Sequence, residues 1–229
     1  MTLREVYENV LTELNKRKAP SLLLADFNYY VMKGIYSYIN IRYLAYDKDQ
    51  QSVDDLGALK IVSAPITLSK TGLQYKGSLP SDYLHILNCK VEFEAKEDYS
   101  CYEAEEVFEV SAQRLPTGAA NHVERNHYFK PSYKLPYFYD HPGQLEIRAG
   151  KDDKVYPKTA YIDYLKTPVV LVLTDEQVEE VADTSQTLEF SHLVCLQIIN
   201  EIIKLVLEHD SNPRLQTNIP VNQTIPPNR

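Results

Sequence analysis

Acidic side chains are the groups in this chain that come closest to a catalytic arrangement. Glu92 and Glu94 fall on one face of a stretch with strand-like alternation, and four more glutamates follow it: Glu103, Glu105, Glu106 and Glu109. Two carboxyl groups can serve as the acid and base that cleave a glycosidic bond. A surface strand followed by an acidic loop has the same composition, so we interpret the cluster as a solvated acidic face.

No other motif indicates catalysis. His122, His127 and His141, with Asp140 nearby, match no zinc-ligand spacing. The sequence has no Gly-x-Ser-x-Gly nucleophile turn, and its seven glycines are too scattered to form a phosphate-binding loop. We therefore expect a protein that is not an enzyme and that needs no metal or cofactor.

Composition narrows the function further. With 229 residues the chain can form one large domain or two small ones. Its 24 lysines and arginines against 32 aspartates and glutamates give a charge of −8, which disfavours sequence-independent binding to DNA. The odd number of cysteines (three, with no Cys-x-x-Cys pair) favours small core residues over disulfides. Because neither a signal peptide nor a membrane-length apolar run is present, we expect synthesis in the cytoplasm and no membrane partner.

The elements that position these residues begin with two helices. Thr2 and Glu5 form a capping box before an apolar helical repeat, and Ser21 is placed to cap a second helix that fades near residue 46. We predict four regions: a helical part over 1–50, a β-rich region over 51–178, a C-terminal helix over 179–210 and an extended arm over 211–229.

The β-rich region shows a period of two. Over residues 85–94 apolar residues alternate with polar ones, which predicts that Val91 and Phe93 are buried while Glu92 and Glu94 point away from the core. The apolar run 168–173 predicts a strand inside the sheet. Residues 111–125 have the pattern of a short helix, and residues 126–142 that of a loop rich in proline and tyrosine.

Residues 191–209 predict a helix with an unusually wide apolar face. Ser191 can cap it, and a second apolar row lies beside the row that we take as the candidate subunit interface, namely Leu193, Leu196, Ile199, Ile203 and Val206. Such a helix is either central in the monomer or shared between its own core and a neighbouring subunit.

The segment 211–229 contains four prolines and no acidic residue, and its isolated apolar residues alternate with polar ones. Proline favours extended or polyproline geometry here. Two interpretations remain open: a disordered end, or an arm that binds a partner. In the second interpretation, the residues expected to contact the partner are Pro213, Arg214, Leu215, Ile219, Pro220, Val221 and Ile225.

Four short segments resemble one protein family. Leu79, Pro80, Asp82 and Tyr83 belong to a Leu-Pro-x-Asp-Tyr-Leu motif that leads into the clearest strand. This motif resembles the one common in head-to-tail connector proteins of tailed bacteriophages, the adaptor or gatekeeper rings. Residues 126–139, residues 161–168 and the end of the last helix through Arg214 continue the resemblance, which is closest to ring proteins of crAss-like phages.

The resemblance implies a structural subunit of the virion that assembles in the host cytoplasm. The family forms rings, here a dodecamer, around the DNA channel, contacts other connector or tail ring proteins and inserts its C-terminal arm into the portal assembly. The expected fold is α+β: a helical bundle made of the N-terminal helices and a long C-terminal helix, with a mostly antiparallel β-sheet insertion and an extended tail. Double-stranded DNA would pass through without specific binding. The alternative function is a tail-associated module that binds a host-surface glycan through the tyrosine-rich loop, and a less favoured one is a cell-wall hydrolase that uses the acidic cluster.

Overall fold

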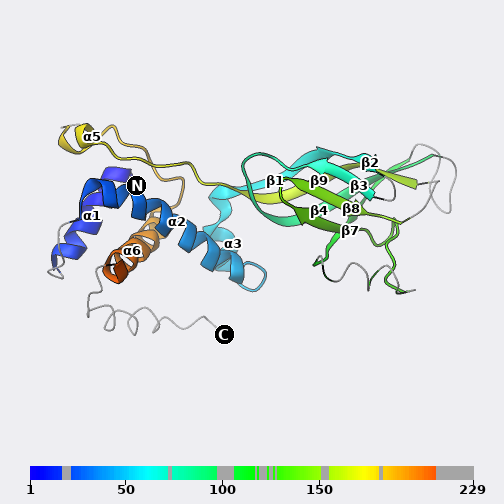
Figure 1. Cartoon of the computed structure of the whole chain (residues 1–229), viewed down its shortest axis with the longest axis horizontal. Helices are drawn as coiled ribbons and strands as arrows, with labels where there is room; N and C mark the ends of the chain where they lie inside the picture. The colour runs from blue at the N-terminus through cyan, green and yellow to red at the C-terminus, as the bar shows by residue number, and fades with distance from the viewer. Residues whose placement is uncertain are drawn as a thin grey trace. The chain divides into compact units, whose positions relative to one another are not determined.

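The chain folds into two compact units. A computed structural model describes the following residues: 1–16, 22–71, 74–96, 106–116, 118, 123, 126, 128–150, 155–180 and 183–209. The helical unit comprises Met1–Ala58 and the chain from Pro168 onward, and the β unit comprises Leu59–Thr167 (Figure 1). Helix α3 and the segment that follows residue 167, both assigned to the β-rich region by the sequence, belong to the helical unit.

Helix α1 (Leu3–Lys16) begins as the sequence predicts. The backbone amide of Thr2 donates to Glu5 Oε2 over 2.9 Å, and the amide of Glu5 donates to Thr2 Oγ1 over 3.2 Å. This reciprocal pair satisfies two amides that the first helical turn leaves without partners. The predicted capping box is confirmed.

Helix α2 (Leu24–Ala45) begins later than predicted. Its N-cap is Leu23, whose side chain makes no capping hydrogen bond, so the predicted cap at Ser21 is wrong. The helix gains its stability from packing instead, because Phe27, Val31 and Ile35 are buried along one side.

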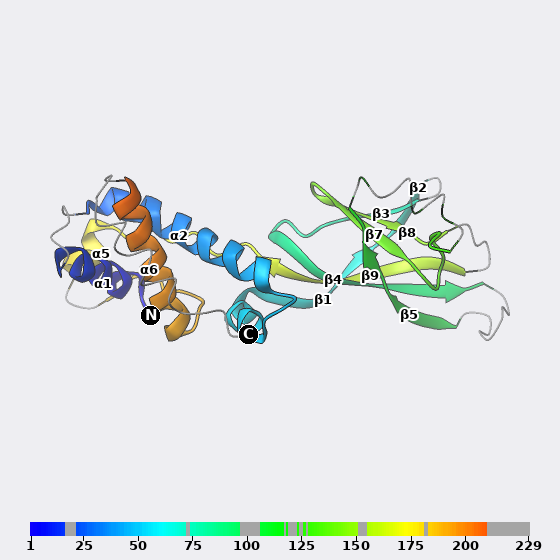
Figure 2. The same cartoon turned by 90° about the horizontal axis from the view of Figure 1, so that it is seen from below.

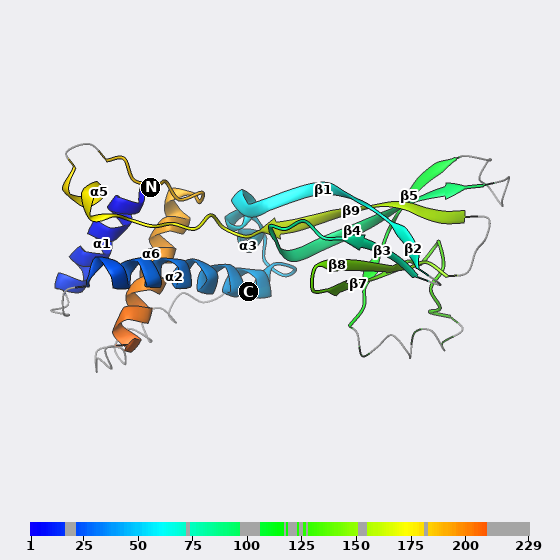
Figure 3. The same cartoon turned by 45° about the horizontal axis from the view of Figure 1, so that its top comes forward.

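Helix α6 (His192–His209) follows Ser191, whose Oγ accepts a hydrogen bond from the amide of Val194 over 3.4 Å, so this predicted cap is confirmed. Figures 2 and 3 both show α6 running across α2. The crossing is close at Gly34, where an added Cβ would lie 2.6 Å from Ile202 Cγ1. A glycine at this position therefore lets the two helices approach each other.

A buried polar network accompanies this crossing. Asp55, at the end of α3 (Gln50–Asp55), accepts a hydrogen bond from Tyr38 Oη over 2.9 Å, and its Oδ2 lies 3.1 Å from Arg42 Nε. Arg42 also donates to Gln197 Oε1 of α6 over 2.8 Å. Burial raises the pKa of Tyr38 well above its ordinary value. The network joins three helices through side chains that are far apart in the sequence.

The β unit contains two sheets. The first has the strand order β1-β9-β4-β5: β1 (Lys60–Thr67), β9 (Val155–Lys166), β4 (Tyr83–Ala95) and β5 (Val107–Ser111). The second has the order β2-β3-β8-β7-β6: β2 (Ser69–Thr71), β3 (Gln74–Ser78), β8 (Gln144–Arg148), β7 (Tyr137–His141) and β6 (Gln113–Arg114). Only β6 and β7 pair in parallel within the described part of the chain. Figure 3 shows the two sheets one over the other, and residues of both form a single core, with Phe93 from the first and Ile147 from the second.

The prediction for β4 is confirmed in its second half. Val91 and Phe93 are buried, while Glu92 and Glu94 are more exposed. The first half differs because the pairing with β9 shifts register between Ile86 and Asn88. A bulge of this kind inverts the side-chain alternation, so Ile86 enters the core and Leu87 does not.

The predicted fold class is wrong. The described residues form an α+β structure with five α-helices and nine strands in two mostly antiparallel sheets, and not a helical bundle carrying one sheet and a long C-terminal helix. At 18 residues α6 is shorter than α2, which has 22, and the two short helices are α3 and α5 (Asp175–Glu179). Alternation along a strand indicates that one face is buried, but it does not indicate which sheet the strand joins.

Three local predictions are also wrong. The apolar run 168–173 belongs to neither sheet. The predicted helix over 111–125 is wrong at its start, where β5 ends and β6 follows, and most of residues 117–125 lie outside the described residues. The predicted loop over 126–142 contains strand β7. Strand β6 pairs with β7, and β7 forms a hairpin with β8 across the turn that follows His141, so strand pairing decides both conformations.

Candidate functional site

The described residues provide no metal site. No group of three or more histidine, cysteine, aspartate or glutamate side chains among them is arranged to hold an ion. His122, His127, Glu103 and Glu105 lie outside the described residues. His141 Nε2 lies 3.4 Å from Glu146 Oε2, an ordinary histidine–carboxylate contact.

The two strand glutamates are each held by a neighbour. Glu92 accepts a hydrogen bond from Tyr161 Oη over 3.1 Å. Glu94 Oε2 lies 2.8 Å from Lys158 Nζ, and this hydrogen bond, assisted by one from Tyr156, lowers the pKa of Glu94. A glycosidase acid needs a raised pKa so that it carries a proton near neutral pH. The geometry of this pair therefore does not favour the hydrolase interpretation.

The Leu-Pro-x-Asp-Tyr-Leu motif has a structural role in the β unit. Asp82 Oδ1 accepts a hydrogen bond from Tyr164 Oη over 3.0 Å, and the Asp82 carbonyl accepts the amide of Thr167 over 2.6 Å. Pro80 and Tyr83 close the turn between them, where the amide of Tyr83 donates to the Pro80 carbonyl over 3.2 Å. Leu79 is buried. The motif thus fixes the start of β4 against the end of β9, and it joins two of the four segments on which the resemblance depends.

The tyrosine-rich segment is largely inside the β unit. Tyr133, Tyr137 and Tyr139 are buried. Tyr128 and Phe129 are 87% and 57% exposed. Of the four tyrosines in residues 128–139, only Tyr128 therefore offers an open ring to a sugar.

The candidate interface row on α6 divides into two parts. Ile199, Ile203 and Val206 are buried in the core of the helical unit, whereas Leu193 and Leu196 are 58% and 41% exposed. The α6 face is thus too wide for its own unit to cover completely. Leu193 and Leu196 remain as candidate contacts to another molecule.

A second exposed apolar surface lies along residues 168–173. Val169, Val170 and Val172 are exposed, while Leu171 and Leu173 are buried. Leu173 is held by Asn28 of α2, whose side-chain amide accepts the Leu173 amide over 2.9 Å and donates to its carbonyl over 2.8 Å. This side chain supplies the pair of hydrogen bonds that a neighbouring strand would supply in a sheet.

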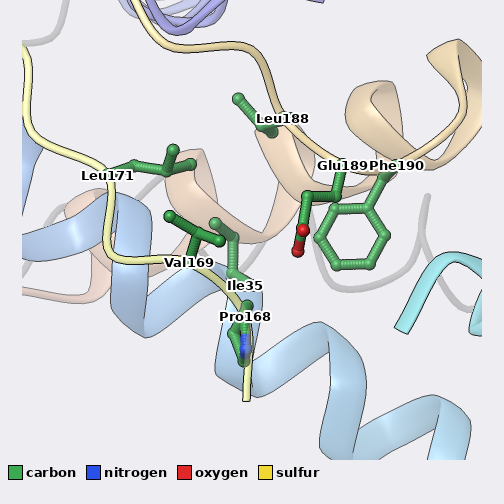
Figure 4. Close-up of a pocket in the computed structure, with 7 residues that line it drawn as sticks. All are labelled: Ile35, Pro168, Val169, Leu171, Leu188, Glu189 and Phe190. Carbon is green, nitrogen blue, oxygen red and sulfur yellow. The ribbon is translucent and has the colours of Figure 1, made fainter. Parts of the chain in front are cut away.

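A small apolar hollow lies beside this segment. Figure 4 shows Pro168 and Val169 on one side and Leu188 and Phe190 on the other, with Ile35 of α2 between them. The space available to a water-sized sphere is only about 10 Å³, which is close to the minimum for a single water molecule. The hollow is too small for a substrate or cofactor, and it adds an apolar depression to the exposed valine surface.

A larger hollow of about 460 Å³ lies on the β unit. Its lining includes Lys70 of β2, Tyr75 of β3, Lys96 just after β4, and Tyr156 and Lys158 of β9. No sequence spacing indicates this hollow, because its lining residues come from four separate places between Thr67 and Lys158.

The arm residues predicted from the sequence, from Pro213 to Ile225, lie outside the described residues, so the structure does not test that prediction.

Among the described residues, no helix has the length and apolarity needed to span a membrane. Cys89 and Cys195 are buried free thiols, as expected for small core residues, and burial raises the pKa of Cys89 to about 12. Cys101 lies outside the described residues.

No known protein family matches the chain, and no curated protein is significantly similar to it.

Proposed function

We propose that the chain is a structural subunit of a bacteriophage head-to-tail connector ring. In this proposal it lies below the portal, forms part of the wall of the DNA channel, and attaches to the portal assembly through residues 211–229. The observation that carries the proposal is the exposure of Leu193 and Leu196 on a helix whose other apolar residues, apart from the half-buried Leu205, are buried in the helical unit. An exposed apolar face of this kind is typical of a surface that a partner covers.

Two separate apolar surfaces of the helical unit support the proposal that the subunit assembles into a ring. A head-to-tail contact joins two different surfaces of one subunit, and it closes into a ring when the rotation between copies allows it. The helical unit offers the exposed leucines of α6 and the exposed valines of residues 169–172. Apolar area removed from water contributes roughly 25 cal/mol per Å², so the two surfaces favour association when they are covered.

The charge distribution also agrees with the proposal. Residues 1–58 and 168–209 carry 8 lysines and arginines against 16 aspartates and glutamates, a formal charge of −8, whereas residues 59–167 carry 14 against 15, or −1. Carboxylates near the channel would repel the phosphates of passing DNA and keep it from adhering. A protein that binds duplex DNA by charge would need the opposite sign.

The second candidate function is glycan binding by a tail-associated module. It is supported by the exposure of Tyr128 and Phe129. A glycan screen with Tyr128→Ala and Phe129→Ala as controls addresses it directly. We favour the connector because the other three tyrosines of this segment are unavailable for stacking on a sugar.

Attachment to the portal assembly is tested on the arm. Removing residues 211–229 should leave the fold intact and abolish attachment in a pull-down with the portal assembly. Substituting aspartate at Leu215, Ile219 and Val221 should have the same effect, since the apolar contacts provide at most about 1.5–3 kcal/mol each and depend on avidity in the ring.

A matched control keeps the charge change and spares the apolar residues. Aspartate at Gln216, Asn218 and Asn222 adds three negative charges to the same segment and should weaken attachment far less. Unchanged attachment of the truncated protein would show that the arm is an ordinary chain end and that the docking surface lies elsewhere.

A further inference from the structure

The larger hollow of the β unit carries an excess of positive charge. Lys158 Nζ is paired with Glu94 over 2.8 Å, which leaves Lys70 and Lys96. Within the described part of the chain neither of these two ammonium groups has a carboxylate at ion-pair distance. Both side chains are exposed. An anionic group that enters this hollow therefore meets two ammonium groups without displacing an existing ion pair.

Two tyrosines hold these lysines in place. Lys70 Nζ lies 6.0 Å from the centre of the Tyr75 ring, and Lys96 Nζ lies 5.2 Å from the centre of the Tyr156 ring. A cation over an aromatic face is attracted to the ring without losing its charge or its hydrogen-bond donors. The hollow, at about 460 Å³, is large enough to admit several side chains.

The complementary charge lies on the helical unit. Residues 174–183 contain five acidic residues and no lysine or arginine. Within this segment Asp175, Glu176 and Glu179 of α5 are exposed, and no basic side chain of the described residues pairs with them. The Thr174–Gln177 capping box fixes the helix that carries them.

We propose that the lysine-lined hollow of the β unit binds the acidic α5 segment of a second copy of the chain. Asp175 and Glu179 are one helical turn apart and so project from the same side of α5. They present two carboxylates to the ammonium groups of Lys70 and Lys96. The contact is head-to-tail, because the hollow of one copy meets a different surface of the next. The inference rests on the proposed ring, to which it adds the chemistry of one contact between neighbours.

Duplex DNA is a poorer occupant of the hollow. Charge-driven DNA binding at physiological salt depends on neutralising many phosphates. The lining of this hollow has only three lysines among the described residues, one of them paired with Glu94, and the chain has a net charge of −8. A contact with two or three ion pairs and an acidic protein segment matches both the size of the hollow and its charge.

Zero-length cross-linking of the full chain tests the contact. A carbodiimide joins a lysine to a carboxylate only when the two touch, and an equal mixture of ¹⁴N and ¹⁵N chains distinguishes links between copies from links within one copy. We expect mixed-isotope links that join Lys70 or Lys96 to Asp175, Glu176 or Glu179. If other lysine–carboxylate links form between copies but these do not, or if these form only within one copy, the inference is wrong.

Charge exchange gives an independent measurement. K70E/K96E and D175K/E179K should each weaken self-association measured by analytical ultracentrifugation by on the order of tenfold, because each places like charges in contact. An equal mixture of the two variants should recover hetero-association, since each retains the half that the other lacks. The control K130E/K134E changes the same charge elsewhere on the β unit, where Lys134 also lies over a tyrosine ring, and should associate like the wild type.

The outcomes separate this inference from the proposed function. Rings that form equally well from K70E/K96E would overturn the lysine contact and leave the connector proposal standing. A wild-type chain that neither self-associates nor attaches to the portal assembly would count against both.

Discussion

The two units of this protein bury their apolar residues to different degrees. In the β unit two sheets enclose one core, and only four large apolar side chains are exposed among the described residues: Val62, Val107, Tyr128 and Phe129. The helical unit exposes nine: Leu23, Tyr29, Ile41, Leu44, Val169, Val170, Val172, Leu193 and Leu196. It also carries nearly all of the net negative charge. The comparison indicates that the β unit encloses its apolar residues more completely, whereas the helical unit leaves more apolar surface exposed.

The largest effect should come from a charge placed on either side of α6. Ile199→Asp puts an unpaired carboxylate where the side chain is 4% exposed and should cost about 4 kcal/mol or more, enough to unfold the helical unit. Leu196→Asp, three residues away and 41% exposed, should keep the far-ultraviolet circular dichroism spectrum and thermal stability while it reduces self-association. If Ile199→Asp folds and assembles normally, the assignment of the buried face of α6 is wrong.

The polar network of the helical unit should give the next largest effect. Asp55→Ala removes the carboxylate that Tyr38 and Arg42 share and leaves them Gln197 as acceptor. It should lower the free energy of unfolding by about 2–3 kcal/mol, because one partner of a nearly buried ion pair is lost. Asp54→Ala removes the same charge at an exposed neighbouring position and should change stability by less than about 0.5 kcal/mol. Equal losses in urea unfolding would show that the network adds nothing specific.

A smaller effect is expected in the β unit. Asp82→Ala removes the acceptor of the Tyr164 hydroxyl but keeps the Asp82 carbonyl that holds Thr167, so the cost should be about 1 kcal/mol. Differential scanning calorimetry should show the loss in the β-unit transition alone, with Ser81→Ala as the exposed control. A shift of both transitions would mean that the two units do not unfold independently.

Helix caps and the alternation along a strand were predictable from the sequence, whereas contacts between distant residues were not. The capping box at Thr2 and the Ser191 cap depend on residues within one turn of helix, and the burial of Val91 and Phe93 follows from alternation. The apolar run 168–173 was assigned to a sheet because such a run suits any extended buried segment. The amide of Asn28, 145 positions from Leu173, provides its hydrogen bonds instead.

The fold class was wrong because the second sheet was not predicted. The prolines and tyrosines of residues 126–142 indicate a loop, although residues 137–141 form strand β7, which pairs with β8 through a short hairpin turn. The second sheet needs that pairing. One of the two candidate surfaces was predictable from the sequence. The apolar face of α6 is wider than one core can cover, which indicated exposed leucines. The lysine-lined hollow was not predictable, because no sequence spacing connects its residues.

The mass of the full chain in solution, alone and with the portal assembly, tests the central claim most directly. The account predicts ring-sized species, formed either by the chain alone with rising concentration or only when the portal assembly is added, and lost in Leu196→Asp. A chain that stays monomeric at all concentrations and does not co-migrate with the portal assembly would contradict it.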